Sequence, residues 1–167
     1  TDLINQSQDE FAVAEENLSE IDFDEFSESG EIDRLEMETA LEDLDTLNTD
    51  LEYIGRTYRD LARGFSDFIP AADSFDSEQY DDAEEGFRNA RNHFSSAAST
   101  IKEGEESATD DLIDDFIGLT CYAEALRDAA DYYTSASEAA SNGNWDTAES
   151  YAEDANAALE RCDYEGV

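Results

Sequence analysis

Basic side chains are scarce in this 167-residue sequence, which carries 9 lysines and arginines against 46 aspartates and glutamates. The formal net charge is −37, and Lys102 is the single lysine. Because nucleic-acid binding needs a basic surface that this composition does not supply, we expect no nucleic-acid partner. No apolar run reaches the ~18 residues that a membrane helix requires, so we also expect no membrane span in this segment.

Residues that commonly carry catalysis are equally few. His93 is the only histidine, which excludes the paired Glu-x-x-His motifs of di-iron bundles and leaves no usual zinc spacing. No glycine-rich phosphate loop, nucleophile elbow or P-loop occurs. Acidic pairs such as Asp110-Asp111 and Asp114-Asp115 are typical of solvated helix faces. The sequence therefore predicts a protein that is not an enzyme, with no catalytic residues, no metal site and no cofactor.

The acidic charge lies on a chain in which 40% of the residues are hydrophobic and 11% are aromatic. That content is enough to bury a core in a single domain spanning residues 1–167. Depletion of lysine, with acids spread along every segment, resembles the salt-adapted acidic proteins of haloarchaea. The resemblance implies folding in concentrated salt, where repulsion between carboxylates is screened because the Debye length falls to about 3 Å at 1 M.

Proline and glycine are also rare, with Pro70 the only proline and 8 glycines, which favours long helices. One apolar stripe alternates spacings of three and four, and it comprises Met37, Ala40, Leu44, Leu47, Leu51, Ile54, Tyr58, Leu61, Phe65 and Phe68. Similar stripes predict about five helices, at about 3–26, 31–74, 78–103, 108–140 and 145–162. Ser77 is the expected cap of the third helix, and Pro70 is expected to kink or end the second.

These helices predict an all-α antiparallel bundle. The helix at 108–140 is apolar around much of its circumference, so it is expected to be central. The helix at 3–26 would fold back along the first half of 31–74, and the helix at 145–162 along the last half of 108–140. The two shorter helices would then share the fourth corner of one four-helix bundle.

Two of the expected hairpins share one register when the chain is shifted by 65 residues, which aligns Tyr80 with Trp145 and turn with turn. The segments YDDAEEGFRNA and WDTAESYAEDA place an aromatic residue, an alanine three positions later and an alanine ten positions later. This pattern resembles the second helix of a tetratricopeptide repeat and implies a protein-docking scaffold. Phe87 fits the large residue of that family, whereas Ala152 does not. The preceding helices are too long for the family and its closing proline is missing, so ordinary packing of alanine and aromatic side chains remains the alternative.

The two cysteines, Cys121 and Cys162, lie at similar distances on either side of the turn SNGN at 141–144. An antiparallel hairpin would bring them level, and Ala125 and Ala158 are small enough to let the helices approach to disulfide distance. Cys121 lies off the main apolar stripe, so two free cysteines buried as small apolar residues remain the alternative. A bridge would place the protein outside the cytoplasm.

Positive charge gathers in one part of the chain, where the expected turn near Asp76 brings six of the ten Lys, Arg and His residues level. These candidate partner-binding residues are Arg56, Arg59, Arg63, Arg88, Arg91 and His93. Arg59 and Arg91 have no acid three or four residues away, so each needs a carboxylate across the bundle or outside the molecule. A protein partner with exposed carboxylates, or an anionic glycan, would suit such a site.

The chain begins at Thr1 rather than at methionine, which we interpret as an upstream segment that was removed or left out. Asn5 and Asn17 begin N-x-S sequons that would accept glycans in an exported chain. We therefore expect a non-catalytic helical interaction or structural module of a haloarchaeal protein that is extracellular or at the cell surface. The alternative is a cytoplasmic adaptor similar to tetratricopeptide proteins.

Overall fold

The computed structural model describes Val13 and residues 34–162, which form α-helices and no strand. The helices are α3 (Arg34–Asp76), α4 (Tyr80–Glu105), α5 (Ile113–Ser141) and α6 (Trp145–Leu159). The all-α helical bundle predicted from the sequence is confirmed for this part of the chain. Apart from Val13, the helix expected at 3–26 lies outside the described residues, as do the sequons at Asn5 and Asn17.

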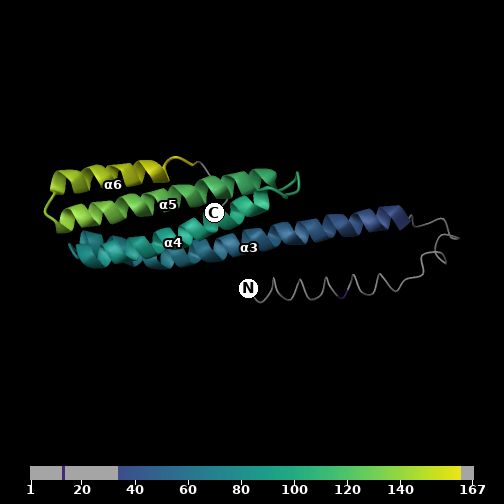
Figure 1. Ribbon diagram of the computed structural model, residues 1–167, viewed down its shortest axis with the longest axis horizontal. Coiled ribbons are helices and arrows are strands. Elements are labelled where there is room, and N and C mark those ends of the chain that lie inside the picture. Colours follow the sequence, from purple (N-terminus) through teal and green to yellow (C-terminus); the bar gives the residue numbers. More distant parts are fainter. Residues whose placement is uncertain (1–12, 14–33, 163–167) are drawn as a thin grey trace.

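Consecutive helices pack against one another, so that α4 lies between α3 and α5, and α5 lies between α4 and α6 (Figure 1). Among the described helices, α6 packs along α5 and not along α3. A helix at the fourth corner of a closed bundle would touch both. The structure therefore differs from the expected arrangement. Alanines on opposite sides of α5 allow both α4 and α6 to pack closely against it, so the four described helices form a row with α6 at its end.

The largest core cluster lies where α3, α4 and α5 meet. Its fully buried large side chains are Phe94, Ile101, Phe116 and Leu119. Burying each such side chain contributes about 1.5–3 kcal/mol relative to leaving it in water. Leu61 brings α3 into this cluster with 3% of its surface exposed, so the three helices share one core.

The apolar stripe of α3 is buried along only part of its length. Leu44, Leu47 and Leu51 are 45%, 38% and 50% exposed, in contrast to Leu61. The N-terminal part of α3 extends beyond the other described helices (Figure 1). From the sequence, the helix expected at 3–26 would cover the first half of 31–74, and of that helix the structure describes only Val13.

Pro70 does not end α3, which continues to Asp76. A proline inside a helix removes one backbone hydrogen bond and costs about 3 kcal/mol. Pro70 itself is exposed, while the next residue, Ala71, is 2% exposed in a cluster with Ala83 and Phe87. Packing against α4 therefore continues past the proline and holds the last turns of α3 in helical form.

The turn between α3 and α4 and the turn between α5 and α6 repeat one another at the 65-residue shift. Each contains one residue in the left-handed region, Glu78 with φ 62° in the first turn and Gly143 with φ 75° in the second. The next residue has φ −92° in both cases. A left-handed residue at this place is the mark of the Schellman motif, which satisfies the last carbonyl groups of a helix.

The backbone hydrogen bonds of the two turns also correspond. The amide of Gln79 donates to the carbonyl of Ser74 at 2.9 Å, and the amide of Asn144 donates to the carbonyl of Ala139 at 2.8 Å. Ser77 belongs to this motif, because its amide donates to the carbonyl of Asp73. The expectation that Ser77 caps the next helix is therefore wrong: Gln79 precedes α4 and makes no side-chain capping bond.

Residues at equivalent positions of the two hairpins touch each other. The rings of Phe68 and Tyr133 have centroids 5.8 Å apart, and those of Tyr80 and Trp145 have centroids 5.6 Å apart. Both pairs meet edge to face, a geometry worth about 0.5–1.5 kcal/mol beyond the area it buries. The second hairpin therefore lies beside the first with its equivalent aromatic residues in contact.

Candidate functional site

Cys121 of α5 and Cys162, just beyond the end of α6, form a disulfide with their Cα atoms 6.0 Å apart. Ala125 and Ala158 are 1% and 6% exposed. Such small side chains let helices come closer than the usual ~8–10 Å between axes. The alternative of two free cysteines is not what the structure contains, since both are paired.

An ionic cluster also links α5 to the segment that follows α6. Asp128 of α5 accepts hydrogen bonds from Nη2 of Arg127 at 2.7 Å and from Nη2 of Arg161 at 2.8 Å. Burial by itself raises the pKa of the Asp128 carboxyl, but the hydrogen bonds and charges of Arg161 and Arg127 outweigh it, so the pKa lies below its ordinary value. Sequence analysis missed this cluster, because Asp128 and Arg161 are 33 residues apart and no local spacing pairs them.

Three of the predicted partner-binding residues, Arg56, Arg59 and Arg63, follow one another on α3 and are called here the α3 arginine row. Arg56 pairs with Glu52 at 3.0 Å. Arg63 and Arg59 share Asp60, at 3.3 Å and 4.0 Å. The side chains of the row are 52%, 41% and 58% exposed in chain order.

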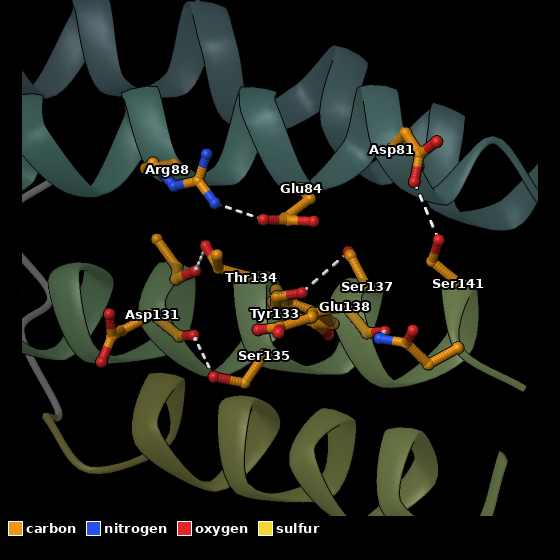
Figure 2. Close-up of polar contacts among 12 residues, drawn as sticks. Asp81, Glu84, Arg88, Asp131, Tyr133, Thr134, Ser135, Ser137, Glu138 and Ser141 are labelled. Carbon is orange, nitrogen blue, oxygen red and sulfur yellow. Dashed lines mark hydrogen bonds and ion pairs between the residues drawn. The ribbon is translucent and has the colours of Figure 1, made fainter. Parts of the chain in front are cut away.

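His93 of α4 lies beside α3, with its Nε2 atom 3.5 Å from a carboxylate oxygen of Asp67. Arg88 and Arg91 lie toward α5 instead, where Nε of Arg91 pairs with Asp131 at 2.6 Å. Figure 2 shows Arg88 pairing with Glu84 on the side of α4 that faces α5. Residues two positions apart on a helix are separated by about 200°, which places Arg91 and His93 on opposite flanks of α4. The six residues therefore form two groups rather than one patch.

The two arginines without an acid at helical spacing have different partners. Arg91 pairs across the bundle with Asp131, which was one of the two options left open by the sequence. The expectation that Arg59 also needs a partner across the bundle or outside it is wrong, because its neighbour in sequence, Asp60, lies within 4.0 Å. Helical spacing of three or four residues does not include this contact, because Asp60 directly follows Arg59 in the sequence.

Asp50 is the one fully buried carboxylate in the described chain, and it holds the connection between α4 and α5 to α3. One of its oxygens, Oδ2, accepts hydrogen bonds from the amide and the hydroxyl of Thr109, each at 2.9 Å. Within the described residues no group of three or more His, Cys, Asp and Glu side chains is placed to hold a metal ion. The two hydrogen bonds to Thr109 link the connection between α4 and α5 to α3.

An open cleft of about 560 Å³ lies between the two equivalent turns. Residues of both hairpins line it, including Glu78, Tyr80, Asp81, Asp82, Ser141 and Trp145. The Ser141 hydroxyl donates to Oδ1 of Asp81 at 2.8 Å, which joins the end of α5 to the start of α4 (Figure 2). The cleft thus combines carboxylates with an indole that is 57% exposed.

Comparison of the chain with protein-family models, curated proteins and solved structures found no match. Within the described part of the chain, no helix combines the length and the apolar character that crossing a bilayer requires.

Proposed function

We propose that this chain is a non-catalytic helical interaction module of a haloarchaeal protein that is exported or attached to the cell surface. The observation that carries the proposal is the bridge between Cys121 and Cys162, because structural disulfides persist in oxidising compartments and are rare in the cytosol. The acidic, lysine-poor composition supports a host that lives in concentrated salt.

The α3 arginine row and His93 provide the contact for a partner that carries carboxylates. Their acids, Glu52, Asp60 and Asp67, bring the local charge close to zero on a chain whose net charge is −37. The arginine side chains are exposed, whereas Asp60, which two of them share, is only 15% exposed. Carboxylates of an acidic protein segment or of an anionic glycan can therefore reach the exposed parts of the guanidinium groups while the internal acids keep their pairs.

Binding to a carboxylated polysaccharide tests this contact. The probe is polygalacturonate immobilised on a column in molar KCl, and the variant Arg59→Gln/Arg63→Gln is compared with Arg88→Gln/Arg91→Gln on the other flank of α4. We expect the first variant to lose about tenfold in affinity or more and the second to bind as the native chain does. Absence of binding by the native chain, or equal loss in the two variants, would contradict the role of the α3 row.

Fractionation of the cells that make the protein tests the compartment. We expect the chain in the envelope fraction or in the medium, and recovery from the cytosol alone would count against export. The cytoplasmic adaptor is the second candidate, and the repeated hairpin with its two corresponding turns favours it. A cytoplasmic adaptor would carry its two cysteines as thiols, which separates the two functions.

A further inference from the structure

We infer that the cleft between the two equivalent turns binds an arginine side chain from a basic segment of a partner protein. The inference rests on the proposed interaction function and adds the chemistry of a second partner contact. It is carried by the exposure of Trp145, by the hollows beside that residue and by the carboxylates at the start of α4.

Trp145 is the only tryptophan in the chain, and it stands between two hollows. On one side lies the cleft of about 560 Å³ that it shares with Tyr80 and Asp81. A second hollow of about 290 Å³ is lined by Trp145 with Asn144 and Asp146. The indole is held by the edge-to-face contact with Tyr80, so it offers a fixed aromatic surface next to open space.

Packing between repeated hairpins does not account for this exposure. Tyr80 is the equivalent residue of the first hairpin, and it contacts Trp145 of the second. If the stack continued, the equivalent ring of a third hairpin would contact Trp145 in the same way and cover it. The outer face of α6 would have to receive that hairpin, but it carries the exposed polar residues Glu149, Glu153 and Asp154. A polar outer face is typical of a helix that ends a stack, so no further hairpin of the described chain covers Trp145 and its ring is open to a ligand.

The carboxylates of the cleft define the charge of that ligand. Asp81 and Asp82 lie in the first turn of α4, and the hydrogen bond from Ser141 fixes the orientation of the Asp81 carboxylate. A guanidinium group is planar, stacks on an indole face and donates two parallel hydrogen bonds to a carboxylate. The cleft supplies both of these partners within one open site.

Concentrated salt favours arginine over lysine at such a site. With a Debye length of about 3 Å at 1 M, only groups in direct contact still attract each other. Lysine offers a compact and strongly hydrated charge, whereas arginine is weakly hydrated and adds the stacking contact. Selectivity for arginine is therefore the property that separates this site from general attraction of cations to an acidic protein.

The experiment is a titration followed by Trp145 fluorescence in molar KCl. The probe is an acetylated, amidated pentapeptide of alternating glycine and arginine, and the matched peptides carry lysine or the neutral analogue citrulline in place of arginine. We expect saturable binding of the arginine peptide that is at least about tenfold tighter than binding of the lysine peptide. The citrulline peptide should not bind measurably.

Two variants with the same change of charge provide the control. Asp81→Asn/Asp82→Asn alters the cleft, whereas Asp114→Asn/Asp115→Asn alters the exposed acids in the first turn of α5, outside the cleft. Circular dichroism in the same salt confirms that both are folded. We expect only the first variant to lose the arginine peptide, by about tenfold or more.

Three outcomes would overturn the inference: no saturable binding, equal binding of the arginine and lysine peptides, or equal loss of affinity in both variants. None of them bears on the disulfide or on the α3 arginine row, so the proposed function would stand without the cleft. Conversely, free thiols and a cytosolic location would contradict export while leaving an arginine site intact.

Discussion

Glu78 and Gly143 hold the same left-handed backbone conformation at equivalent places in two turns, with φ angles of 62° and 75°. Glycine adopts this region freely, whereas a residue with a side chain loses roughly 1–2 kcal/mol there. The Schellman hydrogen bonds and the packed helices on either side therefore hold Glu78 in a conformation that its side chain disfavours.

Replacing Glu78 with glycine is expected to stabilise the protein by about 0.5–1 kcal/mol, because relief of the backbone strain exceeds the added freedom of the unfolded chain. Denaturant unfolding in molar salt measures the change. Glu78→Gln controls for the lost charge, and Gly143→Ala should destabilise by a similar amount, since nothing contacts the new Cβ and only the backbone resists it. A Glu78→Gly variant no more stable than Glu78→Gln would contradict the account of the turn.

Asp128 should link stability to pH. Its pKa is lowered in the folded protein, so its ionised form stabilises the fold above the unfolded pKa, and that stabilisation is lost as pH falls through the folded pKa. The stability difference between the native chain and Asp128→Asn should therefore shrink as the solution is acidified. Chemical unfolding at a series of pH values measures that difference.

The control for this experiment is Glu138→Gln, which changes an exposed acid of the same helix. Its stability difference from the native chain should depend much less on pH. A difference for Asp128→Asn that stays constant from neutral pH into the acid range would show that the cluster with Arg127 and Arg161 does not stabilise the fold.

The net charge of −37 predicts that folding of the chain depends on the salt concentration. Exposed like charges destabilise the compact state when they are not screened, and screening over about 3 Å at 1 M removes most of that repulsion. Helicity measured by circular dichroism is expected to rise steeply between dilute buffer and molar KCl. Complete cooperative folding in dilute buffer would mean that the core outweighs the repulsion without help from salt.

Arg59 and Arg91 should matter little for stability, because their side chains are 41% and 44% exposed and exposed pairs contribute about 0–1 kcal/mol each. Arg59→Gln/Arg91→Gln should therefore unfold at nearly the same temperature as the native chain at fixed high salt. The matched variant Arg127→Gln/Arg161→Gln leaves the partly buried Asp128 without its donors and should cost more. A loss of several kcal/mol in the first variant would mean that these two arginines support the fold.

Much of the fold was predictable from sequence, because the apolar stripes have a clear helical period. The stripe ending at Phe68 predicts a helix over 31–74, and α3 runs over Arg34–Asp76. Local spacing also indicates which acids can pair with Arg56 and Arg63. The predicted range of 31–74 already runs past Pro70, but whether the proline ends the helix could not be decided from sequence, because it depends on the burial of Ala71 against α4.

Features that join distant segments were harder to predict. The level positions of Cys121 and Cys162 follow from the hairpin, but their approach to 6.0 Å depends on how closely α5 and α6 pack. Tertiary geometry that no sequence spacing encodes determines two further contacts, the ion pair of Asp128 with Arg161 and the hydrogen bonds from Thr109 to Asp50. The cleft at Trp145 arises only when the two turns lie side by side.

The state of the two cysteines tests the central claim most directly. Protein isolated from its own host in the presence of an alkylating agent, then unfolded and weighed by mass spectrometry, reveals how many thiols were free. An exported module joined through Cys121 and Cys162 should show no alkylated cysteine before reduction and two afterwards. Two alkylated cysteines before reduction would contradict export and favour the cytoplasmic adaptor.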